Sequence, residues 1–412
     1  MGALGVKKNK YVILLILITS ILAGCNGANQ SEPNPEITKR PLTLDLGRGK
    51  LKTLPSYDKY QPSQLQVDLR SYDLTSLDLK DRYEDLIHAD FDTTTKWPYG
   101  LPDKFNPKKI IEYGKNPGLN IRELHKSGIT GKGVGIAIID GALLVNHVEY
   151  KDKLKLYEEI HCLDKTATPS GCAVVSTVAG EKTGVAPESS IYYIAETHGI
   201  TTQGTPDVDF SSLALAINRI VKINETLSKE DKIRALVIDG GWTQTDNGYN
   251  AINKAVEEAK EQGIFVISNS IYETYNQEMD FSGLGRNPLS NPDDASSYGP
   301  GEEWKSRFFM FEKYSNAKEV LLAPMDSRCT ASPTGDSDYA FYNVGGKKLS
   351  AAYIAGLFAL ACQVRPEITP QEFWHTALKT DDTVHIKNNF INYDYKLKKI
   401  VNPVRLINEL MK

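Results

Sequence analysis

One stretch decides the fold: residues 131–140 read Gly-Lys-Gly-Val-Gly-Ile-Ala-Ile-Ile-Asp. An apolar run without polar alternation predicts a strand that is buried on both faces, which is typical of parallel sheets. The run ends on Asp140, and open α/β sheets place their sites at the carboxyl ends of the strands. An aspartate there is common among α/β proteins. The stretch therefore predicts an α/β fold and marks the edge of the sheet where a site is expected.

From Gly128 onward, short apolar strands alternate with amphipathic helices, and no internal repeat is visible. The expected strands are Val134–Asp140, Ser190–Ala195, Ala235–Asp239, Ile264–Ser268 and Val320–Ala323, and helices are expected near Cys172–Ala179, Ser211–Leu227, Tyr249–Gln262 and Leu349–Gln363. This alternation predicts a doubly wound parallel sheet with helices on both faces.

Three blocks in this region carry a family resemblance. After Asp140 comes Gly184-Val185-Ala186-Pro187, and later an alanine-rich helix from Leu349 contains Gly356. In this order the blocks resemble the subtilisin-like serine proteases, the subtilases. In that family a strand ends on the catalytic Asp, His-Gly-Thr opens a helix, Gly-Val-Ala-Pro follows, and Gly-x-Ser opens a buried helix with Ala-Gly. The resemblance covers about Leu119 to Ala377 and implies a subtilisin-like three-layer fold.

The resemblance assigns the catalytic positions one by one. Asp140 stands at the Asp position. The block Ser170-Gly171-Cys172 matches His-Gly-Thr, so Ser170 stands where the family has its histidine. Gly346-Lys347-Lys348 matches Gly-x-Ser, so Lys348 stands where the family has its nucleophile. The oxyanion asparagine matches Tyr272 only loosely, with Asn269 close by.

Two of the three triad positions therefore carry the wrong chemistry. A serine hydroxyl needs a positioned base to become a nucleophile, and Ser170 is no base near neutral pH. Lys348 would need a strongly lowered pKa, which a neighbouring carboxylate opposes. We expect Ser170 to be a helix N-cap. We expect Lys348 either to pair with Asp140 across the vacated histidine space or to be a solvated lysine in an unused cleft.

A relocated active site is the alternative. It requires a histidine in hydrogen-bond contact with a hydroxyl such as that of Ser350 or Ser176. The histidines are His88, His125, His147, His161, His198, His375 and His385, of which His161 and His198 approach strand ends. Ser350 lies two residues past Lys348, so on a helix it points to another face. Trp242 lies where subtilases line their substrate cleft, and it is expected either to line a retained groove or to be an ordinary edge aromatic.

The N-terminus carries an export signal. Lys7, Lys8 and Lys10 precede an apolar run over residues 11–22, which is short for a membrane span and suits a signal peptide. Leu22-Ala23-Gly24-Cys25 resembles the bacterial lipoprotein box. That resemblance implies cleavage before Cys25 and diacylglyceryl modification of its sulfur, which gives stable attachment to a membrane.

Export affects how the remaining cysteines are interpreted. In an oxidising compartment Cys162 and Cys172 are expected to form a local disulfide, and Cys329 and Cys362 are a second candidate pair unless Cys362 is simply a buried small hydrophobe. The sequence has no Cys-x-x-Cys motif and no paired histidines at the spacing that metal sites use, so we do not expect a metal site from these residues. Calcium is expected from the family resemblance alone, without a matching ligand motif. A net charge of −4 over 412 residues gives no reason to expect nucleic-acid binding.

The expected organisation is a signal peptide (1–24), a flexible tether (25–43), an N-terminal extension that packs on the main domain (44–118), and a subtilisin-like peptidase domain (119–412). The preferred function is a pseudoprotease lipoprotein at the outer face of a bacterial membrane that binds a peptide or protein, because strand addition of a peptide needs no triad. The alternatives are an active exported serine endopeptidase with relocated residues, and a structural partner that stabilises an active relative.

Overall fold

The computed structural model describes Gly2 and residues 36–198, 200–202, 205–207, 209–315, 319–388 and 392–412. Apart from Gly2, all of these residues belong to one compact unit, Pro35–Lys412. Cys25, the signal peptide and the first part of the expected tether lie outside the described residues.

The centre of this unit is a five-stranded parallel sheet in the order β3-β4-β2-β7-β8. Its strands are β2 (Gly135–Asp140), β3 (Leu154–Glu159), β4 (Ser190–Ala195), β7 (Ile233–Ile238) and β8 (Phe265–Ile267). All six residues of β2 are buried, as the apolar stretch that ends at Asp140 predicts. The sequence pattern did not indicate β3, whose exposed Lys155 interrupts an apolar run at the edge of the sheet.

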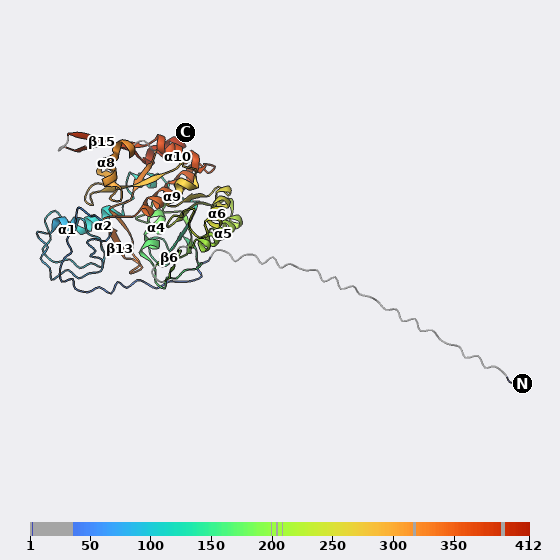
Figure 1. Cartoon of the computed structure of the whole chain (residues 1–412), viewed down its shortest axis with the longest axis horizontal. Helices are drawn as coiled ribbons and strands as arrows, with labels where there is room; N and C mark the ends of the chain where they lie inside the picture. The colour runs from blue at the N-terminus through green and yellow to red at the C-terminus, as the bar shows by residue number, and fades with distance from the viewer. Residues whose placement is uncertain are drawn as a thin grey trace. The chain divides into compact units, whose positions relative to one another are not determined.

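Helices cover both faces of this sheet. Alternate strand residues pack with α4 (Pro169–Ala179) and α9 (Lys347–Val364) in one apolar cluster, and the intervening residues pack with α5 (Ser211–Thr226) and α6 (Tyr249–Glu261) in another. Figure 1 shows the first pair of helices on one side of the green strands and the second pair on the other. The predicted three-layer α/β fold is therefore confirmed.

Local sequence starts several helices in the same way, with a side-chain cap followed by proline. Thr168 accepts a hydrogen bond from the Gly171 N–H at the start of α4, and Pro169 takes the first helical position. The same arrangement begins α2 (Pro107–Lys115), α10 (Pro370–Lys379) and α11 (Pro403–Leu410). Ser170 is thus the second residue of α4 and not its cap. The N-cap prediction was wrong because the helix begins one turn earlier than its apolar residues suggest.

Helix α9 runs through the middle of the molecule. Every residue from Leu349 to Cys362 is buried, which is typical of a helix surrounded by protein on all sides. A Cβ atom on Gly356 would lie 2.7 Å from the Val185 Cβ, so glycine is needed where α9 crosses the Gly184-Val185-Ala186-Pro187 segment. Two of the blocks that carry the family resemblance therefore pack directly against each other.

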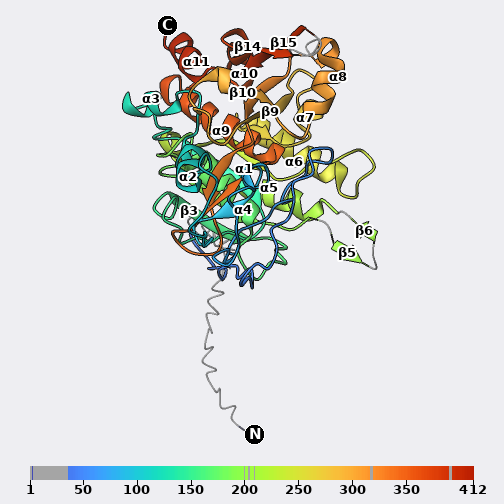
Figure 2. The same ribbon diagram turned by 90° about the vertical axis from the view of Figure 1, so that its left-hand side faces the viewer.

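A second five-stranded sheet, β10-β9-β11-β15-β14, packs against α9 through β9 and β11. It contains β9 (Phe281–Arg286), β10 (Tyr298–Pro300), β11 (Leu321–Pro324), β14 (Asp382–Asn388) and β15 (Tyr393–Ile400), with α7 (Ile271–Thr274) and α8 (Lys305–Ser315) in its connections. Figure 2 shows this sheet with α10 and α11 at one end of the unit, opposite the small hairpin of β5 (Ile200–Thr202) and β6 (Thr205–Asp207). The strand expected at Val320–Ala323 exists as β11, but it belongs to this sheet and not to the central one.

The residues before α3 (Ile121–Lys126) form an additional layer. Helix α1 (Tyr83–Ile87), strand β1 (Phe91–Asp92) and α2 share an apolar cluster with Cys329, Tyr339 and Phe341. Strand β1 pairs with β13 (Tyr339–Tyr342), which pairs with β12 (Arg328–Ala331). The extension therefore supplies one strand of a three-stranded sheet and is built into the same body.

The described end of the expected tether also belongs to this body. Ile37 bridges Tyr157 of the edge strand β3, Thr38 bonds the Tyr157 carbonyl through both its N–H and its hydroxyl, and Lys39 pairs with Glu159. The expectation of a flexible tether over 25–43 therefore does not hold for residues 36–43. Their polar composition does not exclude pairing, because the edge strand offers unpaired backbone groups.

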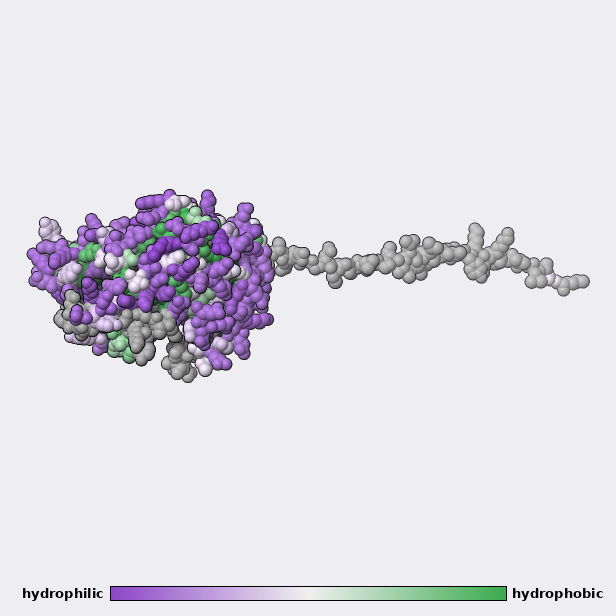
Figure 3. All heavy atoms as spheres, turned by 90° about the horizontal axis from the view of Figure 1, so that it is seen from above, coloured by the Kyte–Doolittle hydropathy of each residue, from purple (hydrophilic) through white to green (hydrophobic). Residues whose placement is uncertain are grey.

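The face of the molecule seen in Figure 3 is mostly hydrophilic, with apolar side chains in small patches. Within the described ranges, no helix combines the length and the apolar character needed to cross a membrane.

Candidate functional site

Two neighbouring strands of the central sheet end on aspartates. Asp140 is the last residue of β2, and Asp239 directly follows β7, which pairs with β2. The Asp239 N–H donates to the Ile139 carbonyl at 3.0 Å, which continues the ladder to the point where both carboxylates leave the sheet. The two acids therefore lie side by side at the carboxyl edge, where sites form in this class of sheet.

Two helix N-termini approach the same edge. Ser170 and Lys348 are the second residues of α4 and α9, which pack together on one face of the sheet. A Cβ atom on Gly171 would lie 2.4 Å from the Tyr193 hydroxyl and 3.1 Å from the Gly141 carbonyl, so glycine allows α4 to come this close to the strand ends. The fold thus brings together all three residues that the resemblance places at triad positions.

These side chains form one connected network. The Ser170 Oγ lies 2.8 Å from Asp140 Oδ2 and 2.9 Å from Asp239 Oδ2, and its one proton bonds one carboxylate at a time. The Lys348 Nζ donates to the Ser170 Oγ at 2.7 Å and forms an ion pair with Asp239 Oδ2 at 2.8 Å. The lysine therefore lies beside Ser170, but its carboxylate partner is Asp239 and not the expected Asp140, which it reaches only through Ser170.

The charges of this network balance one another within a largely buried site. Asp140 is 3% exposed. Burial and the nearby Asp239 raise the pKa of the Asp140 carboxyl to about 7, while Lys348 and the Ser170 hydrogen bond act in the opposite direction. Lys348 and Asp239 keep side-chain exposures of 34% and 26%. One ammonium thus compensates two adjacent carboxylates, the deeper of which is held close to neutrality by burial.

Lysine at the start of α9 is unusual for a helix. Gly346 gives the helix no side-chain cap, and Lys347 and Lys348 at the next two positions oppose the helix dipole. Asp239 compensates Lys348, and the Lys347 ammonium lies 4.6 Å from the centre of the Phe281 ring. Both lysines therefore have partners that offset an unfavourable local position.

The relocated triad that we considered does not form among the described residues. The Ser350 hydroxyl is buried and donates to the Ala323 carbonyl at 3.1 Å, and the Ser176 hydroxyl bonds the Ala173 carbonyl and the Ala331 N–H. The hydrogen bonds of the histidine rings go to backbone groups or to acids: His88 to Glu84, His125 to Val185, His147 to Asp338 and Glu149, His161 to Thr197, His198 to Glu196, and His385 to Asp394. No described histidine thus contacts either hydroxyl.

The two looser predictions fall elsewhere. Tyr272 lies on α7, and its hydroxyl donates to Gln277 Oε1 at 3.2 Å. The hydroxyl therefore bonds a neighbouring residue of its own segment and not a group of the network. Asn269 is exposed, and its N–H donates to the Gly240 carbonyl. Trp242 is buried against Phe210, and its indole N–H donates to Asn253. Of the two expected roles of Trp242, lining a groove and being an ordinary edge aromatic, the packing of its indole into the α5 and α6 layer does not support the first.

The expected disulfides are absent: Cys162, Cys172, Cys329 and Cys362 are free thiols. Cys172 and Cys362 lie in the large central cluster, Cys329 belongs to the separate cluster beneath the N-terminal extension, and Cys162 bonds the Asp164 carbonyl. Proximity in sequence failed as a guide because α4 turns the Cys172 side chain into the core. Across the described residues, no three His, Cys, Asp or Glu side chains gather as metal ligands.

The sequence pattern does not single out Asp239, although a signal exists. Ile139-Asp140-Gly141 and Ile238-Asp239-Gly240 repeat the same three residues after two apolar strands.

A second acid that was not predicted, Glu196, follows β4 and is buried. Its Oε2 bonds the His198 Nδ1 at 2.9 Å, and its Oε1 has no partner among the described groups. Burial lowers the pKa of His198, but the bond to Glu196 and the negative charges of Glu196, Asp239 and Asp140 together outweigh it, so the net shift is upward.

Fold and site together define a three-layer α/β protein with an Asp–Ser–Lys–Asp network at the carboxyl edge of its sheet. No family model and no curated protein matches the chain. Among solved structures it is similar to the prenylagaramide maturation protease PagA (16% identity, TM-score 0.45), covering 71% of this chain and 98% of that one. A cold-adapted subtilisin-like serine proteinase gives 16% identity and a TM-score of 0.41, covering 66% and 90% of the two chains. The A-subunit of an AB5 toxin from E. coli gives 14% and 0.48, covering 72% and 98%.

Proposed function

We propose that this chain is a catalytically inactive relative of the subtilisin-like proteases that binds a peptide or protein. The observation that carries the proposal is the ion pair of Lys348 with Asp239 at 2.8 Å. At the position where the family has its nucleophile, this chain has a cation that already serves to compensate two carboxylates.

The groups that accept the hydrogen bond of the Ser170 hydroxyl are the carboxylates of Asp140 and Asp239, and no described histidine belongs to the network. Lys348 lies 2.7 Å from the Ser170 Oγ, and its ion pair with Asp239 opposes loss of the proton that would free a lone pair. Removing a base from a triad leaves only the residual catalysis of binding and oxyanion contacts. The scaffold contacts of Gly171 and Gly356 persist, so the loss concerns the chemistry and not the fold.

Binding of an extended peptide is the ligand mode that survives loss of a triad. Peptides that add to a strand are held by main-chain hydrogen bonds, and these need no catalytic side chain. Together with the lipoprotein box at Cys25, this gives a peptide- or protein-binding lipoprotein at the extracytoplasmic face of a bacterial membrane as the proposed role. Metabolic labelling with palmitate in wild-type and Cys25→Ala cells tests the anchor, and equal labelling of both contradicts it.

A second candidate function has one observation in its favour. Serine–lysine pairs act as nucleophile and base in some hydrolases, and the Ser170–Lys348 distance of 2.7 Å suits such a pair. It requires Lys348 to lose its proton beside Asp239, which the ion pair opposes. The inactive form is therefore the preferred proposal, and the active pair is its direct competitor.

Labelling with a fluorophosphonate serine probe separates the two. The purified protein, its Ser170→Ala and Ser350→Ala variants and an active subtilase are treated in parallel, with circular dichroism as the check of folding. We expect no labelling of the folded protein. Labelling that Ser170→Ala abolishes and Ser350→Ala leaves intact would establish the serine–lysine pair and overturn the proposal.

A further inference from the structure

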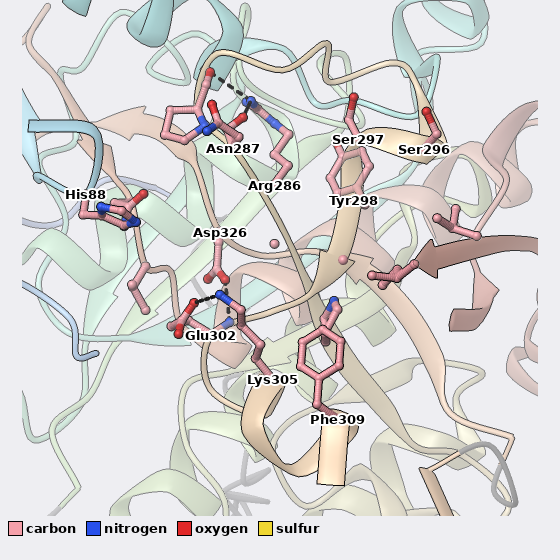
Figure 4. Close-up of a pocket in the computed structure, with 18 of the residues that line it drawn as sticks. His88, Arg286, Asn287, Ser296, Ser297, Tyr298, Glu302, Lys305, Phe309 and Asp326 are labelled. Atoms are coloured by element: carbon pink, nitrogen blue, oxygen red, sulfur yellow. Dashed lines mark hydrogen bonds and ion pairs between the residues drawn. The ribbon is translucent and has the colours of Figure 1, made fainter. Parts of the chain in front are cut away.

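A separate cavity of about 560 Å³ lies between the N-terminal extension and the second sheet. Its walls come from several parts of the chain: the end of α1 with His88, the β9–β10 region from Gly285 to Pro300, the segment from Glu302 to Phe309, the residues Asp326, Asn343 and Val344, and strand β14 from Val384 to Lys387. In Figure 4, His88 stands on one side of the space and Tyr298 and Phe309 on the other. Neither Ser170 nor Lys348 lines it, so the cavity is distinct from the network at the central sheet.

One wall carries a buried cation without a carboxylate partner. Arg286 is 8% exposed, and its guanidinium donates to five backbone carbonyls, those of Tyr113, Asn287, Pro288, Ser290 and Ser327, at 3.0–3.2 Å. It forms no ion pair with a described residue; Asp293 attracts it at longer range, but the Asp293 oxygens bond Asn116 and Asn120. Buried charges are normally paired, so a positive charge here is left for an anion to balance.

Other cations face the same space. Lys387 is exposed at its rim and has no partner among the described residues. Lys305 also lines the cavity and pairs with Glu302 at 3.1 Å. The His88 Nδ1 bonds the Glu84 carbonyl, and its ring stacks on Tyr57 at 3.8 Å, so the ring is fixed in position while its Nε2 stays available.

The acids of the cavity do not cancel this charge. Both oxygens of Asp326 accept backbone N–H bonds, from Gly345 at 2.9 Å and Glu302 at 2.8 Å. Burial raises the pKa of the Asp326 carboxyl to about 7, so part of its population is neutral near that pH. Glu302 is compensated by Lys305. Arg286 and Lys387 therefore remain as the cations without a local partner.

Apolar side chains complete the walls. Tyr298 and Val384 are buried, and Phe309 and Ile386 are half-buried. The guanidinium N–H groups of Arg286 are already spent on carbonyls, so the bidentate grip that suits phosphate is not available from it. A ligand with one negative group and an adjacent apolar group matches this lining better than an inorganic anion does.

We propose that this cavity binds an organic carboxylate that carries an apolar group, with Lys387 as the contact for the carboxylate. Two sources share this chemistry: a small carboxylic acid, and the free C-terminal residue of a peptide. The site stands independently of whether the network at Ser170 is inert.

Titration calorimetry on the full chain tests the proposal with N-acetyl-leucine and with acetyl-Ala-Ala-Ala-Leu, each beside its C-terminal amide. We expect saturable binding of at least one acid and binding of its amide weaker by about tenfold, the effect of losing one charge-assisted hydrogen bond. Binding of both acids with similar affinity assigns a small carboxylate, and binding of the peptide acid alone assigns a peptide C-terminus.

Variants locate the binding. Lys387→Gln is expected to weaken binding of the acid by about tenfold and to leave the amide unchanged. Lys398→Gln, an exposed lysine on the neighbouring strand β15 that does not line the cavity, is the matched control and keeps wild-type affinity. The proposal is overturned if neither acid binds, if acid and amide bind equally, or if both lysine variants behave alike.

Discussion

The network at the central sheet and the cavity beside the second sheet use charge in opposite ways. At the sheet, Lys348 bonds Ser170 and Asp239, and Ser170 links them to Asp140, so the charged groups satisfy one another. In the cavity, Arg286 is held by neutral carbonyls and Lys387 has no described partner. The contrast indicates that the charged groups at the central sheet stabilise one another, while the charge left for a ligand lies in the cavity.

The largest effect is expected from removing the cavity's buried cation. Arg286→Met leaves five carbonyls without their donor, and we expect the free energy of unfolding to fall by about 3–5 kcal/mol. Urea denaturation measures the loss. Arg365→Met, which removes a guanidinium from an exposed pair with Glu372, is the control and is expected to cost less than about 1 kcal/mol. Equal losses would show that burial of Arg286 has little energetic weight.

The stability of the protein is expected to depend on pH through one buried carboxyl in each region, Asp140 at the central sheet and Asp326 in the cavity. In the folded protein the pKa values of Asp140 and Asp326 are both raised to about 7, so folding favours their protonated forms. Their contribution to stability is full below about pH 4 and is lost as the pH rises through 7, a change on the order of 4 kcal/mol for each carboxyl. Asp140→Asn and Asp326→Asn are each expected to flatten the curve of stability against pH in urea titrations between pH 4.5 and 7.5. Unaltered slopes in both variants argue against buried carboxylates as the cause.

Breaking the ion pair at the sheet is expected to have a smaller effect, since both partners are partly exposed. Lys348→Met leaves Asp239 and Asp140 uncompensated and should lower the free energy of unfolding by about 1–2 kcal/mol. Adding Asp239→Asn should recover part of this loss, which a double-mutant cycle measures. Lys347→Met, one residue earlier on α9, tests whether any lysine at this helix end gives the same result.

The smallest change is expected from Ser170→Ala. Its hydroxyl connects three charged groups but is partly exposed, and we expect a loss of about 0.5–1.5 kcal/mol in thermal or urea unfolding. Thr168→Ala, which removes the N-cap of the same helix, is expected to cost about 1 kcal/mol. A far larger loss from Ser170→Ala would mean that the serine, and not the lysine, holds the network together.

Features of the structure that depend on neighbouring residues were predicted from the sequence, and features that depend on distant segments were not. Strand β4 was predicted with the observed bounds, because Ser190 and the five apolar residues after it stand between polar flanks and define the strand locally. The position of Ser170 beside Asp140 followed from the family resemblance. The partner of Lys348 did not, because the choice between two adjacent carboxylates depends on how α9 approaches the sheet. Trp242 and the cysteines were misplaced for the same reason, since their surroundings come from distant segments.

The pairing of residues 37 and 38 with β3 has a mechanical consequence. If the chain is held at a membrane by its N-terminal lipid, any tension along that tether enters the body at this point. The Thr38 bonds to Tyr157 and the Lys39–Glu159 pair then carry the force before it reaches the ladder between β3 and β4. Because the contact is parallel to the strand, a pull along the chain shears these bonds together and does not open them one after another. With such an anchor, the edge of the sheet would bear a pull at the surface before the interior does.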